Sequence, residues 1–283
     1  MTQLKLAASP EIMGILNVTP DSFSDGGNYS NPERAVQRAL EMVEQGATII
    51  DIGGESTRPG AESISVSEQL ERVIPVIEGI RQSSIKDVLI SVDTTRSEVA
   101  KSALEAGASW LNDVSAGDDS RIKGSEKEPM LLLAAKHSCP IVLMHRQGES
   151  AVMQDKPHYD DVCVEVSDYL VKRAQAALDA GVPKDNIIVD PGIGFGKLLS
   201  HNLQLLAGLE SLVSLDYKVL LGTSQKRFLG EITGIENPQQ RVVATCATTA
   251  LGVKAGVAIF RVHDVHENKQ ALDVAWQIKQ VKN

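Results

Sequence analysis

Eight short apolar runs alternate with amphipathic stretches along almost the whole chain, and this alternation limits the folds that the sequence can adopt. Short apolar runs of this kind predict buried strands, and strands that alternate with helices predict a parallel sheet with right-handed crossovers. Eight such units in a chain of 283 residues predict one (β/α)8 TIM barrel over residues 1–283. The runs are EIMGILN (11–17), ATIIDIGGE (47–55), VLISVDTT (88–95), SWLNDVSA (109–116), CPIVLMH (139–145), NIIVDPGIG (186–194), KVLLGTS (218–224) and VAIFRVH (257–263).

The stretches between these runs carry helix signals. PERAVQRALEMVEQG (32–46), RSEVAKSALEAG (96–107) and PQQRVVATCATTALGVKAG (238–256) each close on Gly, a common residue just beyond a helix end. An open doubly wound sheet is the alternative fold, but no GxGxxG motif opens a helix after the first strand. We therefore expect a closed α/β barrel with long loops after its first and second strands.

Each of the eight runs ends in polar residues. A single Asp at a strand end is more often a turn residue or a helix cap, but eight consecutive runs of this kind are harder to explain in that way. Because the carboxyl ends of barrel strands form the active-site face, we expect a ligand site at that rim. The polar residues are Asn17, Asp51, Asp93, Asn112, His145, Asp190, Ser224, Arg261 and His263.

Composition and charge disfavour several classes of function. The net charge of −9 argues against nucleic acid as a partner, whereas an anionic small ligand needs only local cations and backbone N–H groups. Cys139, Cys163 and Cys246 lie apart in apolar or helical contexts, which favours reduced core thiols over a catalytic Cys–His pair. No apolar run is long enough to cross a membrane, and MTQLKLAASP is too weakly basic for a secretory signal. We therefore expect a cytoplasmic protein with no membrane partner.

Asp93, Asn112 and Asp190 combine two carboxylates and an amide at the expected rim. This set suits a flat heterocycle with several N–H donors, such as an aminopyrimidinone edge. The same carboxylates can bind a metal ion or act as a general acid and base, although no His-rich spacing indicates a tight transition-metal site. The spacing alone leaves heterocycle binding and acid–base chemistry both open.

Two motifs late in the chain have both a structural and a functional interpretation. DPGIGFGK (190–197) is either a tight turn that needs positive φ or a close approach of backbone to a flat ligand, with Phe195 as an apolar wall. GTSQKRF (222–228) places Lys226 after the seventh run. A Schiff-base lysine usually projects from within a strand among apolar neighbours, so the polar neighbours of Lys226 favour a hydrogen bond or charge contact.

Cationic side chains supply candidate anion sites. In RVHDV (261–265), Arg261 and His263 occupy alternate positions and face the same way. With Asn17 from the first strand, which is the neighbour in a closed barrel, they form a plausible diphosphate pocket. The alternative for Arg261 is an internal salt bridge with Asp264 or another nearby carboxylate. In ESTRPGA (55–61), Arg58 is either a second anion site or a surface arginine.

The order of the motifs resembles one known family, the dihydropteroate synthases, over nearly the whole chain. The resemblance implies a pterin-binding (β/α)8 barrel of folate biosynthesis, a transferase of an alkyl group that is a homodimer and a sulfonamide target. It also implies Mg²⁺-dependent condensation of 6-hydroxymethyl-7,8-dihydropterin diphosphate with 4-aminobenzoate, giving 7,8-dihydropteroate and pyrophosphate. The motifs are NVTPDSFSDGG, DIGGESTRPGA, SVDT, NDVSA, LMH, DPGIGFGK, SQKRFLG and RVHDV.

The resemblance assigns a role to each matching residue, in three groups. The residues implied to hold the pterin are Asp93, Asn112, Asp190 and Lys226. Those implied for the diphosphate are Asn17, Arg261 and His263, with Asn17 as the Mg²⁺ ligand. Those implied for 4-aminobenzoate are Phe23, Thr57, Arg58, Pro59, Phe195 and Ser224.

The loop NVTPDSFSDGG (17–27) is longer than an ordinary strand-to-helix connection. The family's reaction is dissociative, so a pterin-stabilised cation forms after the bond to pyrophosphate breaks. Water would consume that cation, and the site must close before ionisation. We interpret the loop as a lid in which Asp25 or Asp21 places negative charge near the cation and Gly26 and Gly27 form the hinge. Asp25, Asp21 and Lys226 are therefore the predicted catalytic residues.

Two positions depart from the family pattern, and two rival functions remain. Gln225 stands where many members carry Arg, and Arg146 stands where Met is common. A pterin-barrel methyltransferase does not need the TRPG loop, the lid or RVH. A non-catalytic pterin-binding protein is expected to have lost residues in the lid or at Lys226, and Gln225 is the one departure of that kind.

Overall fold

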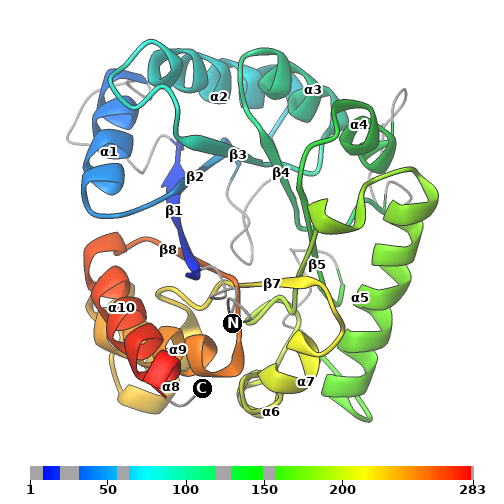
Figure 1. Cartoon of the computed structure of the whole chain (residues 1–283), viewed down its shortest axis with the longest axis vertical. Coiled ribbons are helices and arrows are strands. Elements are labelled where there is room, and N and C mark those ends of the chain that lie inside the picture. Colours follow the sequence, from blue (N-terminus) through cyan, green and yellow to red (C-terminus); the bar gives the residue numbers. More distant parts are fainter. Residues whose placement is uncertain (1–8, 20–31, 56–63, 119–128, 149–156, 282–283) are drawn as a thin grey trace, which may run out of the picture.

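The computed structural model describes residues 9–19, 32–55, 64–118, 129–148 and 157–281. Its eight strands are all parallel and close into a barrel in chain order, from β1 round to β8, which pairs with β1 again (Figure 1). This arrangement confirms the predicted (β/α)8 fold. The strands are β1 (Glu11–Asn17), β2 (Ile49–Gly53), β3 (Leu89–Asp93), β4 (Trp110–Asp113), β5 (Ile141–Met144), β6 (Ile187–Asp190), β7 (Lys218–Leu221) and β8 (Ile259–Val262).

Helices surround the barrel on the outside (Figure 1). Their ends follow local chemistry: Ser65 caps α2 by accepting from the Glu68 N–H, Asp161 caps α5, and Gly256 ends α9 at φ 103°. The helices are α1 (Pro32–Glu44), α2 (Val66–Arg81), α3 (Ser97–Glu105), α4 (Met130–His137), α5 (Val162–Asp179), η3 (Lys184–Asn186), α6 (Leu199–Ala207), α7 (Leu209–Val213), α8 (Arg227–Thr233), η4 (Pro238–Arg241), α9 (Val242–Ala255) and α10 (Val265–Val281).

Alternation along the strands separates an inner from an outer core. Outward residues such as Ile12, Leu16 and Ile52 pack against the helices. Inward residues form a second apolar cluster, which fills the end of the barrel opposite the carboxyl ends of the strands; we call this the lower part. The cluster contains Met13, Ile49, Trp110, Val142, Ile188, Leu220 and Ile259.

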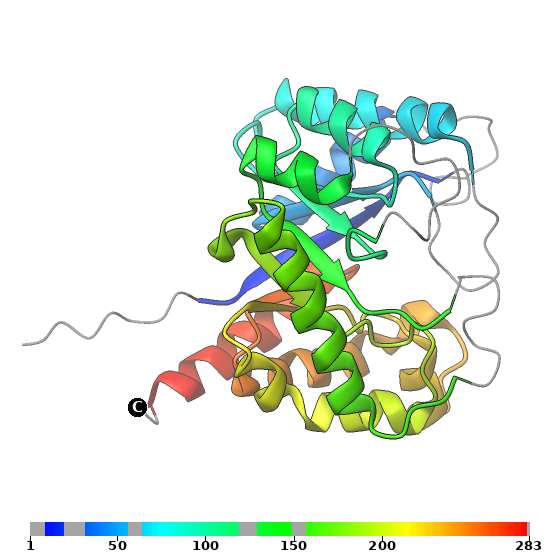
Figure 2. The ribbon, with the colours of Figure 1, turned by 90° about the vertical axis from the view of Figure 1, so that its right-hand side faces the viewer.

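Polar side chains begin one inward step above this apolar cluster. Because side chains point to the same face every second residue, the next inward position after Ile49 is Asp51, and after Ile259 it is Arg261. The same two-residue step leads from Trp110 to Asn112 and from Ile188 to Asp190. The strand arrows in Figure 2 point away from the side on which the C-terminus lies. All these polar side chains therefore gather at one mouth of the barrel.

None of the helices within the described ranges is both long and apolar enough to cross a membrane.

Candidate active site at the carboxyl rim

The register of the first four strands brings four rim residues into one row. Asn17 pairs with Gly53, Gly53 with Asp93, and Asp93 with Asn112. A Cβ atom on Gly53 would lie 3.7 Å from Asn17 Oδ1 and 3.8 Å from Asp93 Oδ2. These two oxygens therefore flank the space that a side chain at position 53 would otherwise occupy. The structure confirms that residues at separate strand ends meet at the rim.

Arg261 lies at the centre of this group and binds two carboxylates. Its Nε donates to Asp51 Oδ2 over 2.6 Å, and its Nη2 donates to Asp93 Oδ2 over 2.7 Å. Asn112 Nδ2 also donates to Asp51 Oδ2, over 2.9 Å. The internal salt bridge considered for Arg261 therefore exists, with Asp51 and Asp93 as partners. Asp264 instead accepts from Gln225 Nε2 at 3.0 Å.

Asp51 is a site residue to which the sequence analysis gave no role beyond its place at the end of a run. It is fully buried, and it joins Arg261 to Asn112 from one layer below the rim. The sequence does contain a sign that Asp51 points into the barrel. It lies two residues after Ile49, and side chains two positions apart on a strand point to the same face.

Two buried carboxylates, at the rim and one layer below it, each have an oxygen atom that can accept a further hydrogen bond. Within the described part of the chain, Asp51 Oδ1 and Asp93 Oδ1 are buried without a hydrogen-bond partner. Burial raises the pKa of Asp93 to about 7, against the lowering effect of Arg261. The two carboxylates in turn raise the pKa of the Arg261 guanidinium, despite its burial. An unpartnered buried acceptor is costly, so a ligand that brings N–H donors to this depth would be stabilised here.

A second group lies around the glycine-rich turn after β6. Asp190 Oδ1 accepts from the Gly192 N–H over 2.7 Å, and burial raises the pKa of Asp190 although the Lys226 charge opposes this. The Nζ of Lys226 donates to the Ile193 carbonyl and lies 4.6 Å from the centre of the Phe195 ring. Burial lowers the pKa of Lys226 to about 8. Lys226 thus makes the hydrogen-bond and charge contacts that its polar neighbours predict.

Ser224 and His263 form a third group, between β7 and β8. Ser224 Oγ lies 2.9 Å from His263 Nδ1, and it also accepts from the His263 N–H over 3.1 Å. The resemblance places Ser224 with 4-aminobenzoate and His263 with the diphosphate. The structure joins the two residues directly, so Ser224 lies beside the residue that is expected to bind the diphosphate.

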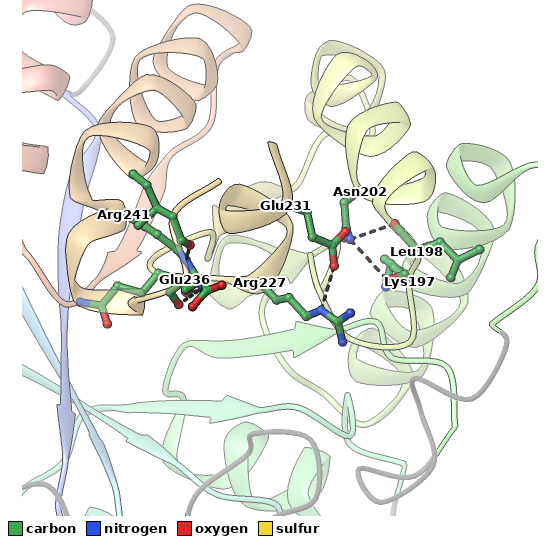
Figure 3. A network of polar contacts seen from close by, with 9 residues as sticks. Lys197, Leu198, Asn202, Arg227, Glu231, Glu236 and Arg241 are labelled. Atoms are coloured by element: carbon green, nitrogen blue, oxygen red, sulfur yellow. Dashed lines mark hydrogen bonds and ion pairs between the residues drawn. The ribbon is translucent and has the colours of Figure 1, made fainter. Parts of the chain in front are cut away.

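Gln225, one of the two departures from the family pattern, is held by contacts with neighbouring residues. Its φ is 59°, its side chain donates to Asp264, and its carbonyl accepts from Arg241 Nη1 over 2.9 Å. Arg241 also donates to the carbonyl of Glu236, the contact drawn in Figure 3. The Gln225 side chain is therefore held by Asp264, the residue that precedes α10.

The other predicted site residues lie outside the described residues. They are Asp21, Phe23, Asp25, Thr57, Arg58 and Pro59, and the proposed hinge at Gly26 and Gly27 lies there too. The nine within the described ranges all come from strand ends or from the segments directly after them. These nine are Asn17, Asp93, Asn112, Asp190, Phe195, Ser224, Lys226, Arg261 and His263.

The donor set at the rim includes oxygen atoms of the kind that Mg²⁺ binds. Among the residues that the structure describes, no three His, Cys, Asp or Glu side chains gather into a metal-binding group. Mg²⁺, however, commonly takes only one or two protein oxygens and completes its shell with water and substrate phosphates. Asn17 Oδ1 is a hard oxygen beside Asp93 at the rim. The residues therefore fit an ion that arrives with a phosphate group.

The site as a whole combines deep acceptors with cations nearer the rim. Asp51, Asp93 and Asp190 are almost fully buried, and such groups suit N–H donors of a planar ring. Arg261 and Lys226 supply positive charge, and Arg261 Nη1 has no hydrogen-bond partner among the described residues. The arrangement suits a molecule that is both a nitrogen-rich heterocycle and an anion.

Comparisons with known proteins agree with this geometry. The model of a family described as pterin binding enzyme matches residues 13–263. The chain is 47% identical to dihydropteroate synthase of Streptococcus pyogenes over 268 residues, which cover 94% of this chain and 95% of that protein. It resembles the crystal structure of Yersinia pestis dihydropteroate synthase with a sulfonamide drug complex, with 41% identity, a TM-score of 0.87 and coverage of 96% and 95% of the two chains. Xanthomonas albilineans dihydropteroate synthase with 4-aminobenzoic acid is 47% identical, with a TM-score of 0.85 and coverage of 96% and 93%.

Proposed function

The chain belongs to the pterin-binding enzyme family, among the dihydropteroate synthases, and we propose that it condenses 6-hydroxymethyl-7,8-dihydropterin diphosphate with 4-aminobenzoate in folate biosynthesis. The products are 7,8-dihydropteroate and pyrophosphate. One observation carries the proposal: Arg261 joins two buried carboxylates, each of which keeps one oxygen unpartnered within the described residues. That arrangement supports a site for N–H donors directly beneath a site for an anion.

The pterin ring is proposed to bind in the deep part of the mouth. Its amino and ring N–H groups would donate to Asp93 and Asp190, and the Asn112 amide, held by Asp51, would serve the remaining edge. Lys226 would contact the same ring from the side of Phe195. Each of these side chains is already fixed by a neighbour, so binding would require little reorganisation.

The diphosphate is proposed to lie nearer the rim, between β1 and β8. Arg261 Nη1, His263 and the Asn17 amide line this side of the mouth, and Ser224 orients the His263 ring. When bound, Mg²⁺ would neutralise charge on the leaving diphosphate, and Asn17 Oδ1 would be its protein ligand.

The proposed chemistry is a dissociative substitution. The C–O bond between the pterin methylene carbon and the diphosphate breaks first, and pyrophosphate leaves with the electron pair. The amino nitrogen of 4-aminobenzoate then bonds to the methylene carbon and releases one proton. Preorganised charges are the main means by which a protein stabilises such charge separation. The buried carboxylates Asp93 and Asp190 support this assignment because, when ionised, they would place negative charge beside the proposed pterin site.

The second substrate and the lid complete the proposal. Phe195 would form one wall of the 4-aminobenzoate site, together with Phe23, Thr57, Arg58 and Pro59 from the first two loops. Asp25 or Asp21 would bring negative charge to the cation when the first loop closes. Exclusion of water during ionisation is the physical reason for such a lid.

The test is pyrophosphate release from the pterin diphosphate with Mg²⁺, with and without 4-aminobenzoate. Lys226→Met should lower turnover strongly, because the Lys226 side chain contacts the proposed pterin site. Lys184→Met is the matched control, since Lys184 is an exposed lysine that pairs with Asp216 on the opposite face of the barrel. Release coupled one-to-one to dihydropteroate formation is the expected result. Tight pterin binding without turnover by the folded protein would instead identify a binding protein.

We also propose that the enzyme is a homodimer joined through α9 and α10, which lie side by side outside the barrel (Figure 1). A hollow of about 450 Å³ between them is lined by Ala250, Ala271 and Ala275 together with Val274 and Ile278. Val274 is 62% exposed and Ile278 58% exposed. Large exposed apolar patches commonly mark protein–protein contacts.

A cytoplasmic location is proposed as well, because Cys139, Cys163 and Cys246 are free thiols.

A further inference from the structure

A buried lysine forms hydrogen bonds with the glycine-rich turn after β6. The proposed chemistry gives this lysine no role. Lys197 is only 3% exposed. Its Nζ lies 3.0 Å from the carbonyl oxygens of both Gly192 and Phe195, and 2.9 Å from His145 Nδ1. An ammonium group has three N–H donors, and here each has an acceptor. Two of these acceptors belong to the turn itself, at its beginning and near its end.

Other elements fix two further backbone groups of the turn. The Gly194 N–H donates to Asn202 Oδ1 over 2.7 Å, and the Tyr159 hydroxyl donates to the Gly196 carbonyl over 2.8 Å. Asn202 also donates to the carbonyls of Leu198 and Lys197, the contacts drawn in Figure 3. The turn therefore has anchors on α6, on the segment before α5 and on its own following lysine.

The turn also lies in direct contact with the exit of β5. A Cβ atom on Gly192 would lie 1.8 Å from the His145 carbonyl oxygen, and one on Gly196 would lie 2.3 Å from that of Gln147. Both glycines have positive φ, 62° and 63°. The backbone approaches this closely because neither residue has a side chain. Any shift of the turn would break its contacts with Lys197 or collide with the β5 exit.

A lysine is energetically unfavourable at position 197, because the position is buried. Burying an ammonium group is unfavourable even when it is hydrogen-bonded. Burial, with the nearby charge of Lys226, lowers the pKa of Lys197 to about 7. An apolar side chain of similar length would fill the space without that penalty, but it would remove the Lys197 donor from the Phe195 carbonyl and leave the Gly192 carbonyl with only the Phe195 N–H.

We propose that Lys197 is a positioning residue for the second substrate, which fixes the turn so that Phe195 and the Ile193 carbonyl keep their places. The Ile193 carbonyl accepts from Lys226, and the Phe195 ring lies beside the same ammonium group. Loss of the Lys197 contacts would release the wall of the 4-aminobenzoate site and loosen one hydrogen bond of Lys226. The inference rests on the proposed function, because it takes Phe195 as part of that site.

The test compares Lys197→Met with Lys184→Met, whose lysine is exposed and lies away from the rim. In Lys197→Met, the KM for 4-aminobenzoate should rise about tenfold or more, since small misplacements of positioning groups have effects of this order. The Kd for the pterin diphosphate should change less, by about threefold, because Asp93 and Asn112 lie on other strands and only Asp190 and Lys226 contact the turn. Amide hydrogen exchange in peptides covering residues 190–200 should speed up by about tenfold, with α10 unchanged. Lys184→Met should match the wild type in all three.

Each outcome decides a separate part of the inference. Unchanged exchange in residues 190–200 would overturn the role of Lys197 in fixing the turn. Faster exchange with an unchanged KM would overturn its link to 4-aminobenzoate. If the wild type does not turn over, the proposed function fails, and direct titration with 4-aminobenzoate together with the exchange data still decides the role of Lys197.

A second variant covers the case in which Lys197→Met does not fold. His145→Phe keeps a ring against Tyr169, which the His145 ring meets edge-on at 5.0 Å, but removes the Nδ1 acceptor. Lys197 then keeps only its two turn carbonyls. The KM for 4-aminobenzoate and the exchange of residues 190–200 should both rise by about threefold, the loss of one hydrogen bond. Wild-type values for both would overturn the inference.

Discussion

At the scale of single residues, the site is defined by one guanidinium between two carboxylates. Arg261 uses Nε and Nη2 for Asp51 and Asp93, which leaves Nη1 for a ligand at the rim. When both carboxylates are ionised, one guanidinium leaves an excess of buried negative charge. A cationic intermediate beside this cluster would be stabilised more strongly than a neutral one, because charges interact strongly where water is excluded.

The raised pKa of Asp93 predicts how pterin binding depends on pH. With a pKa of about 7, Asp93 is largely protonated below that pH and then cannot accept from an N–H donor at its protonated oxygen. Affinity for the pterin should therefore fall by about tenfold between about pH 8 and about pH 6, as measured by calorimetric titration with 6-hydroxymethylpterin.

The matched variants are Asp93→Asn and Asp216→Asn. Asp93→Asn should bind the pterin weakly at both pH values and show little pH dependence, since its amide does not titrate. Asp216→Asn, on the face opposite the mouth, should keep the wild-type profile. A flat wild-type profile would contradict the role given to Asp93.

The positions of the site residues were predictable from the sequence only in part. Asp93, Asn112 and Asp190 end apolar runs, and that position gave their place at the rim. Lys197 and His145 are 52 positions apart, and the spacing of residues in the sequence does not predict their contact. Asp51 lies two residues before the end of its strand, so its inward direction follows from alternation while its partners do not.

At the scale of elements, the turn after β6 depends on glycine at position 192. Gly192 combines φ of 62° with a neighbouring carbonyl oxygen 1.8 Å from any Cβ, whereas Gly234 has φ of 72° and nothing within 4 Å. Gly234→Ala should therefore cost only the left-handed backbone, about 1 kcal/mol. Gly192→Ala adds a clash with backbone and should cost about 3 kcal/mol or more. Urea unfolding followed by circular dichroism measures both, and equal losses would contradict the close packing of the turn.

The first loop can be tested through Asp25, one of its two acidic residues. Asp25→Ala should leave the Kd for the pterin diphosphate nearly unchanged, because the proposed pterin acceptors lie on β3 and β6. Turnover should fall by about a hundredfold, since a charge aimed at the transition state contributes on this order. Asp185→Ala, in η3, is the control and should behave like the wild type. Unchanged turnover in Asp25→Ala would remove the loop from the mechanism.

The elements themselves followed closely from the sequence pattern. The first run, residues 11–17, coincides with β1, and α1 begins at Pro32 as expected. The run 186–194 contains only β6, because Gly192 and Gly194 have positive φ and turn the chain. The predicted helix over 238–256 is a 3-10 turn followed by α9. Strands were predictable because their apolar runs are short and buried, while their ends depend on backbone conformation that hydropathy does not encode.

At the scale of the whole molecule, the apolar surface of α9 and α10 should determine the oligomeric state. Val274→Glu and Ile278→Glu place charge in the hollow between these helices and should convert a dimer into a monomer, measured by light scattering after gel filtration. Val164→Glu is the control, because Val164 is 54% exposed on α5 and outside the hollow. A wild type that is already monomeric would contradict the proposal.

The apolar cluster that fills the lower barrel closes one end of the central channel. The seven side chains from Met13 to Ile259 leave the carboxyl mouth as the route to the polar cluster above them. Asp51 lies at the bottom of that cup, one layer below Asn112, while Phe195 lies near its lip and is only partly buried. A molecule seated at the bottom must enter before one seated at the lip and must leave after it. If the pterin binds at the bottom and 4-aminobenzoate at the lip, as proposed, the closed base of the barrel would make the pterin substrate bind first and the pterin product leave last.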